Sequence, residues 1–67
     1  MTTIEKLIAK RPWISHIDDE RDLDQGIIVT LHKGWCFTAD RGCGVYGFDT
    51  MKEVIEGTSK DSVYKEA

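Results

Sequence analysis

The stretch Gly26-Ile-Ile-Val-Thr-Leu-His-Lys-Gly-Trp-Cys-Phe-Thr-Ala-Asp-Arg-Gly-Cys-Gly-Val-Tyr-Gly-Phe48 decides the fold of this 67-residue chain. It holds four of the six aromatic residues, a run of four β-branched residues at 27–30, both cysteines and five of the six glycines. β-Branched and aromatic residues favour extended backbone, and glycines permit the tight turns between strands. The stretch therefore predicts a small antiparallel sheet, with helical sequence before and after it.

Three strands are predicted within this stretch, at residues 27–32, 35–37 and 45–48. Lys33-Gly34 favours a tight hairpin turn between the first two, and the alternative is one long strand with a bulge at Gly34. Ala39-Asp40-Arg41-Gly42 has the composition of the second turn. If one register runs through the first hairpin, one buried face carries Ile27, Val29, Leu31, Trp35 and Phe37.

Two short helices flank the strands. Thr2 and Glu5 form a capping box at the start of the first helix, which Pro12 ends. Thr50 and Glu53 form a second capping box, and Gly57 is placed to end that helix in the left-handed conformation. Helical spacing gives each an apolar stripe, formed by Ile4, Leu7 and Ile8 in the first and by Met51, Val54 and Ile55 in the second.

The predicted fold class is α+β, with an N-terminal helix, a three-stranded antiparallel meander and a C-terminal helix packed on one face. The length fits one small domain over residues 1–67. Trp13, Ile14 and Ile17 either pack on the core or begin an edge strand. Residues 58–67 have only Val63 and Tyr64 as anchors, so a frayed helical turn or a flexible tail is expected there.

The composition is that of a globular protein, with 40% hydrophobic and 31% charged residues. The sequence has no apolar run of the roughly 18 residues that span a bilayer, and its first residues lack the pattern of a secretory signal. We therefore expect a cytoplasmic protein that does not bind membranes. A net charge of -3 argues against direct binding to nucleic acid, which requires a basic face.

An acidic segment between Ile17 and Gly26 dominates the charge pattern. It carries a net charge of -4, so the rest of the chain carries only +1. An EF-hand calcium loop starting at Glu20 is excluded, because its sixth and twelfth positions hold Gln25 and Leu31 rather than Gly and Glu. The segment is expected to be an exposed loop that is either simply solvated or docks on a basic protein partner. Its acids are Asp18, Asp19, Glu20, Asp22 and Asp24.

A second candidate surface is the exposed face of the hairpin around Arg41 and Tyr46. The arginine offers charge, and the tyrosine offers apolar area together with a polar hydroxyl. We expect both residues to be available to a protein partner.

Cys36 and Cys43 flank the predicted turn at residues 39–42. If that turn is symmetric about residues 39 and 40, the cysteines face each other, and a disulfide or a shared metal is conceivable. His32, with His16 as a fourth ligand, would complete a two-histidine, two-cysteine set. However, no Cys-x-x-Cys spacing is present, and a cytoplasmic compartment is reducing. The expectation is therefore free thiols, with no metal and no cofactor.

The sequence gives little support for catalysis. No nucleophile motif surrounds either cysteine. Gly42, Gly44 and Gly47 match Gly-x-Gly-x-x-Gly, but the dinucleotide motif requires a strand-to-helix junction that is not predicted here. We expect no enzymatic activity.

From Ile17 to Ile55 the chain resembles small uncharacterised proteins of bacteria and their phages. The resemblance covers just over half of the chain and implies no particular activity. It implies an accessory protein of a mobile element, and such proteins often bind and block a host protein such as a defence nuclease. The segments that carry it are Asp19-Glu20-Arg21, Leu31-His32-Lys33-Gly34-Trp35, Phe48-Asp49-Thr50 and Glu53-Val54.

The expected function is that of a small non-enzymatic protein-binding module, monomeric or homodimeric. It would be a phage or mobile-element inhibitor of a host nucleic-acid-binding or defence complex, comparable in role to an anti-CRISPR protein. The alternative is a small metal-stabilised or nucleic-acid-associated accessory domain. A cysteine-dependent enzyme is the less favoured hypothesis.

Overall fold

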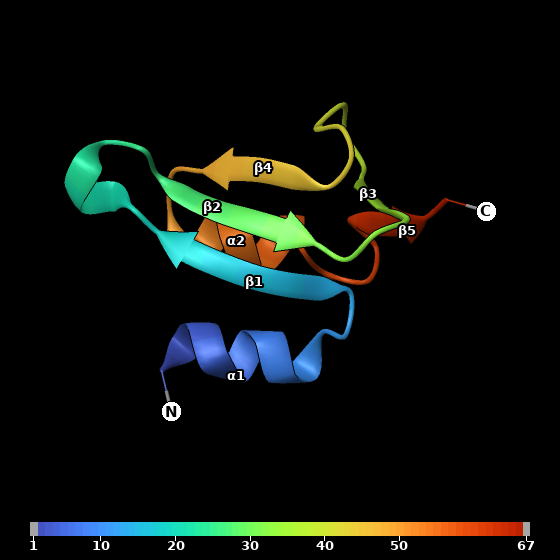
Figure 1. The fold of residues 1–67 in the computed structure, drawn as a ribbon, viewed down its shortest axis with the longest axis horizontal. Coiled ribbons are helices and arrows are strands. Elements are labelled where there is room, and N and C mark those ends of the chain that lie inside the picture. Colours follow the sequence, from blue (N-terminus) through green and yellow to red (C-terminus); the bar gives the residue numbers. More distant parts are fainter. Residues whose placement is uncertain (1, 67) are drawn as a thin grey trace.

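The computed structural model describes residues 2–66 as an α+β fold with two α-helices and two antiparallel sheets (Figure 1). This confirms the predicted α+β class, but not the predicted arrangement of strands. Over this range, no helix is long and apolar enough to cross a membrane. In chain order the elements are α1 (Thr3–Lys10), β1 (Ile14–Asp19), the 3-10 turn η1 (Arg21–Leu23), β2 (Ile27–Leu31), β3 (Trp35–Phe37), β4 (Val45–Phe48), α2 (Met51–Gly57) and β5 (Val63–Lys65).

The larger sheet has the strand order β1-β2-β4, so the predicted meander of residues 27–48 is wrong. The central strand β2 pairs with β1, where Ile17 lies opposite Val29, and with β4, where Tyr46 lies opposite Val29. Ile14 and Ile17 are buried and add a third apolar strand to the core face. The edge-strand alternative for this segment is therefore correct, and a bulge between Ile14 and His16 adjusts its register.

Strand β3 leaves this sheet and pairs with β5 instead. Gly34 does form a turn, with φ +93° and a hydrogen bond from the Trp35 amide to the His32 carbonyl, but it redirects the chain and no β2–β3 hairpin forms. The predicted frayed helical turn is not formed, because Val63–Lys65 is the strand β5. Val63 lies opposite Phe37 and is buried beside it in the core, and this burial orders the end of the described chain.

The core lies between the larger sheet and α2, which passes behind the sheet in Figure 1. Ile27, Val29, Leu31 and Phe37 are buried there as predicted, and Trp35 packs half-buried at the margin. Alternation along β2 puts Ile27, Val29 and Leu31 on one face and leaves Ile28 and Thr30 half-buried on the other.

Both helices begin where the capping residues predict. Thr2 and Glu5 exchange hydrogen bonds in a complete capping box. Thr50 caps α2 through a hydrogen bond from the Glu53 amide, at 3.2 Å, while the Glu53 carboxylate accepts from the amide of Asp49.

The predicted left-handed end of α2 at Gly57 is wrong. Gly57 is the last helical residue, and the C-cap is Thr58. A Cβ on Gly57 would lie only 2.7 Å from Cζ of the Phe48 ring. Glycine is therefore needed here for close packing of helix on sheet, and not for a positive φ.

The end of α1 is tied to the end of α2 by side chains. Arg11 donates hydrogen bonds to the Ile55 carbonyl at 2.7 Å and to the Thr58 hydroxyl at 2.6 Å. The Trp13 indole donates to the Thr58 carbonyl at 2.7 Å. The carbonyls at a helix C-terminus lack partners within the helix, so these bonds stabilise that end and fix α1 beside the sheet.

Candidate functional site

The acidic turn (residues 18–25) consists of the last two residues of β1 and most of its connection to β2, and this connection projects beyond the rest of the larger sheet (Figure 1). Its backbone is hydrogen-bonded: the Glu20 amide donates to the Gly26 carbonyl at 2.8 Å, and the Gln25 amide donates to the Glu20 carbonyl at 3.1 Å. Gly26 and Asp24 both have positive φ, at 77° and 56°. The carboxylates are therefore carried on a defined turn.

The prediction that all the acids lie in a loop is wrong for the first two. Asp18 and Asp19 belong to β1 and lie opposite Ile28 and Ile27 of β2. Their side chains are nevertheless exposed, so strand pairing needs no burial of charge. Asp18 Oδ2 lies 3.6 Å from Nε2 of His16, and both side chains are more than half exposed.

Asp19 and Arg21 form a bidentate ion pair, with Nε to Oδ1 at 2.8 Å and Nη2 to Oδ2 at 2.6 Å. The hydrogen bonds from Arg21 lower the pKa of the Asp19 carboxyl below its ordinary value of 3.8. The pair therefore stabilises the turn above that pH and loses its effect as the pH falls through the lowered pKa. Because both groups are in solvent, the contribution is small.

The other three acids of the turn are not paired with a basic side chain of the described chain. Glu20, Asp22 and Asp24 have no ion-pair partner within residues 2–66. With Asp18 they give the acidic turn a local excess of negative charge.

Leu23 lies in the middle of the acidic turn, between Asp22 and Asp24, and is 68% exposed. Leu23 is not among the site residues predicted from sequence, although a single leucine within an acidic run is a signal for it. Complete burial of such a side chain is worth about 1.5–3 kcal/mol. The turn thus combines charge with one apolar group that the fold itself does not use.

Arg41 and Tyr46 lie together, although the predicted hairpin of residues 35–37 with residues 45–48 does not form. The Arg41 guanidinium carbon is 5.6 Å from the centre of the Tyr46 ring and 5.3 Å from that of the buried Phe48 ring. Arg41 therefore covers the aromatic edge of the core, while Tyr46 remains 38% exposed. The segment 38–42 lies at the opposite end of the larger sheet from the acidic turn (Figure 1), so the two do not form one surface.

Cys36 and Cys43 form a disulfide, so the expectation of free thiols is wrong. The turn is centred on Ala39 and Asp40, which both have positive φ, and the Phe37 amide donates to the Gly42 carbonyl at 2.8 Å. This is the symmetric turn under which the cysteines were predicted to face each other. Their Cα atoms are 3.9 Å apart. The expectation of free thiols rested on a reducing compartment and did not take this proximity into account.

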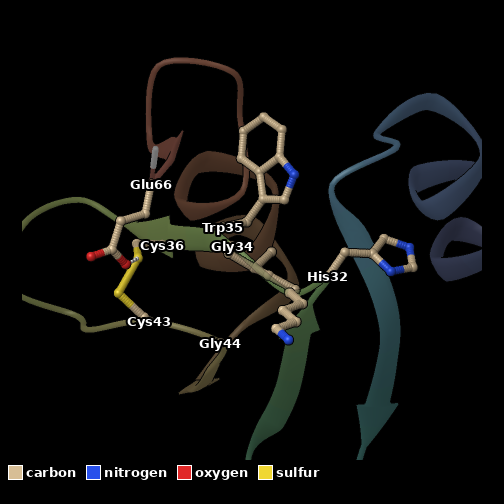
Figure 2. Close-up of a pocket in the computed structure, with 9 residues that line it drawn as sticks. His32, Gly34, Trp35, Cys36, Cys43, Gly44 and Glu66 are labelled. Atoms are coloured by element: carbon tan, nitrogen blue, oxygen red, sulfur yellow. Dashed lines mark hydrogen bonds between the residues drawn. A yellow bond between two sulfur atoms is a disulfide. The ribbon is translucent and has the colours of Figure 1, made fainter.

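The two-histidine, two-cysteine metal set is not assembled. His16 lies on β1 beside Asp18, and the His32 ring points away from the disulfide (Figure 2). Glu66 approaches instead, with Oε2 at 3.5 Å from Sγ of Cys36. Because a disulfide sulfur carries no hydrogen, this is a contact and not a hydrogen bond.

Cys36, Cys43 and Glu66 line a shallow pocket of about 170 Å³, shown in Figure 2. Cys36 is buried, whereas Cys43 and Glu66 are exposed at its mouth. Glu66 could not be found from the sequence, because only the pairing of β5 with β3 brings it there. Its amide donates to the Gly34 carbonyl at 2.6 Å, which fixes its backbone beside the pocket.

Comparison with known proteins supplies no function for these groups. The chain matches no protein-family model, no curated protein and no solved structure. The acidic turn, the Arg41–Tyr46 pair and the disulfide pocket are therefore interpreted from their own chemistry.

Proposed function

We propose that this chain is a small non-enzymatic protein-binding module that docks its acidic turn on the basic surface of a protein partner. One observation carries the proposal: a projecting, hydrogen-bonded turn presents several carboxylates around the exposed Leu23. The fold gains nothing from this arrangement, because like charges repel and an exposed leucine contributes no core packing.

Charge and apolar surface have different roles in such an interface. The field of the unpaired acids draws a basic surface in and orients it, which raises the association rate. Leu23 then loses its contact with water, which slows dissociation. Because hydrogen bonds already order the turn, less conformational entropy is lost on binding than for a flexible loop.

We infer the class of partner from the charge and from the resemblance to small phage and bacterial proteins. A host complex that binds nucleic acid carries a basic surface for phosphate groups, and an acidic turn can occupy that surface and block it. The module then acts in the cytoplasm as an inhibitor of a nucleic-acid-binding or defence complex. It works as a monomer or homodimer, without touching nucleic acid or membrane itself.

Removal of charge from the acidic turn should slow binding. With Asp18, Asp22 and Asp24 changed to Asn, we expect association with the partner to slow about tenfold or more at low salt, with a flatter salt dependence. Stability should stay the same or rise, because repulsion is relieved. Asp19 is left unchanged, since it pairs with Arg21.

The measurement needs the partner first. Immobilised wild-type protein captures it from a bacterial lysate, and association is then measured with both purified proteins. A matched control changes Asp40 and Asp61 to Asn and Glu56 to Gln, which removes the same net charge from exposed sites outside the turn. Wild-type kinetics for the acidic-turn variant, or an equal loss in the control, would exclude the turn as the interface.

Truncation of Leu23 should weaken binding without affecting the fold. For Leu23→Ala we expect the free energy of unfolding to change by less than about 0.5 kcal/mol, as for exposed sites in general. Partner affinity should fall about tenfold, which corresponds to about 1.4 kcal/mol of lost burial. Ile55→Ala, at a 40% exposed apolar site on α2, is the control and should bind normally. Calorimetry gives both affinities, and unchanged affinity for Leu23→Ala would remove Leu23 from the interface.

A further inference from the structure

The ligand atoms of Cys36, Cys43 and Glu66 lie within 4.8 Å of one another at the mouth of the pocket (Figure 2). We propose that these residues form a binding site for a divalent metal ion of the zinc class when the disulfide is reduced. Two thiolates and one carboxylate are a donor set that zinc accepts. The disulfide form cannot bind the ion in this way, because its sulfurs are not thiolates.

The spacing of sulfur and oxygen fits a tetrahedral ion. With Zn–S near 2.3 Å and Zn–O near 2.1 Å, two ligands of one tetrahedral zinc are about 3.6 Å apart. Oε2 of Glu66 already lies 3.5 Å from Sγ of Cys36. Two sulfur ligands are about 3.8 Å apart in such a site, so the sulfurs bind only after the covalent bond between them is broken.

Backbone hydrogen bonds hold the three ligands in place independently of the disulfide. Cys36 and Cys43 are opposed across the hairpin, where Phe37 bonds to Gly42 and the Gly44 amide donates to the Trp35 carbonyl at 3.3 Å. Glu66 follows β5, which pairs with β3. The exposure of Cys43 and Glu66 leaves the fourth position on the solvent side, where a water molecule completes the tetrahedron.

The change of state is a two-electron reduction. A thiolate of a dithiol reductant attacks one sulfur of the disulfide and forms a mixed disulfide with that cysteine. The second thiol of the reductant then attacks the mixed disulfide and frees the cysteine. The reductant leaves as a disulfide, and Cys36 and Cys43 each end as a thiol. Binding of the ion then releases one proton from each thiol.

The two states connect different parts of the fold. The disulfide joins only the two arms of one hairpin, whereas a metal ion would also hold Glu66 at the end of β5. Reduction in the presence of the ion therefore exchanges one crosslink for another that includes the C-terminal strand.

Cobalt(II) binding tests the site directly. The intact chain is reduced with a phosphine and titrated with Co²⁺ under anaerobic conditions. We expect one equivalent to bind, with a thiolate-to-cobalt charge-transfer absorption that Zn²⁺ abolishes and that oxidised protein lacks. Absence of that absorption from the reduced protein would overturn the proposal.

Glu66→Gln separates this site from adventitious binding by two cysteines. The affinity of this variant should fall at least tenfold, since even the loss of an outer partner commonly costs about 10–100-fold. Asp61→Asn, at an exposed acid outside the cluster, should retain wild-type affinity. Equal affinities of Glu66→Gln and wild type would remove Glu66 from the site.

Thermal unfolding gives a second readout that does not depend on a stable reduced form. Zn²⁺ should raise the Tm of the reduced protein, because it binds only the folded arrangement. If the reduced chain is unfolded, Zn²⁺ should restore its native circular dichroism. The double variant Cys36→Ser with Cys43→Ser should show neither effect. The proposal would be overturned if Zn²⁺ changed neither the Tm nor the circular dichroism of the reduced wild type.

Discussion

Replacement of Phe37 by Ala should lower the free energy of unfolding by about 3–5 kcal/mol. Phe37 is only 2% exposed, and its ring centre lies 5.8 Å from that of Phe48 and 6.0 Å from that of Tyr46. It also lies opposite Val63, so the variant loses contacts in both sheets. Since small domains are stable by only about 5–15 kcal/mol, the loss approaches the whole stability of this chain. Urea denaturation followed by circular dichroism measures it.

Tyr64→Ala is the control for the loss of an aromatic ring from the smaller sheet. Tyr64 lies next to Val63 on β5 but is 50% exposed. Its truncation should cost less than about 1 kcal/mol, because little apolar area leaves the core. A Phe37→Ala variant that unfolds cooperatively at the wild-type urea concentration would show that the contacts of Phe37 with both sheets do not stabilise the fold.

Gly26→Ala should also be strongly destabilising, with a loss of about 2–5 kcal/mol in the free energy of unfolding. Left-handed backbone costs a non-glycine residue roughly 1–2 kcal/mol, and φ of Gly26 is +77°. A Cβ would also meet the Phe48 carbonyl oxygen at 2.6 Å, which forces a backbone shift. Such overpacking typically adds about 1–3 kcal/mol.

Gly34→Ala separates these two effects. Gly34 has φ +93°, but a Cβ there would meet no atom within 4 Å. It should therefore show the conformational cost alone, about 1–2 kcal/mol. Equal losses for the two variants would mean that the approach of Gly26 to Phe48 is unimportant.

Two glycines thus fix the position of Phe48 from different sides. The absence of a Cβ at Gly26 leaves room for the carbonyl group of Phe48, and the absence of a Cβ at Gly57 of α2 leaves room for its ring. Between them, the turn before β2 and the last turn of α2 are packed on one residue of β4. Both glycines therefore allow close packing around Phe48, which is itself buried in the core.

The proposed interface and the proposed metal site can be tested separately. The acidic turn joins β1 and β2 at one end of the larger sheet, and the cysteine pocket lies toward β3 and β5 at the other (Figure 1). Substitution of the acids leaves every group that lines the pocket in place. A failure of either proposal therefore leaves the other standing.

The sequence alone determined the features that depend on neighbouring residues. The capping pairs at Thr2 and Thr50 start the helices, and alternation buries Ile27, Val29 and Leu31 on one face of β2. These features follow from local hydrogen bonding and from side-chain periodicity, which act within a few residues. The symmetric turn that brings Cys36 to Cys43 is local in the same sense.

Only the tertiary structure decided which strands pair. Alternation in β2 specifies a buried face but no neighbour, so the sequence could not show that β1 and β4 flank it while β3 pairs with β5. The choice depends on apolar surface far away in the chain, such as Val63, which is buried beside Phe37. The contact of Glu66 with Cys36, at 3.5 Å, joins residues that are 30 positions apart in the sequence. It forms only in the folded chain, because long-range packing of β5 on β3 brings the two residues together.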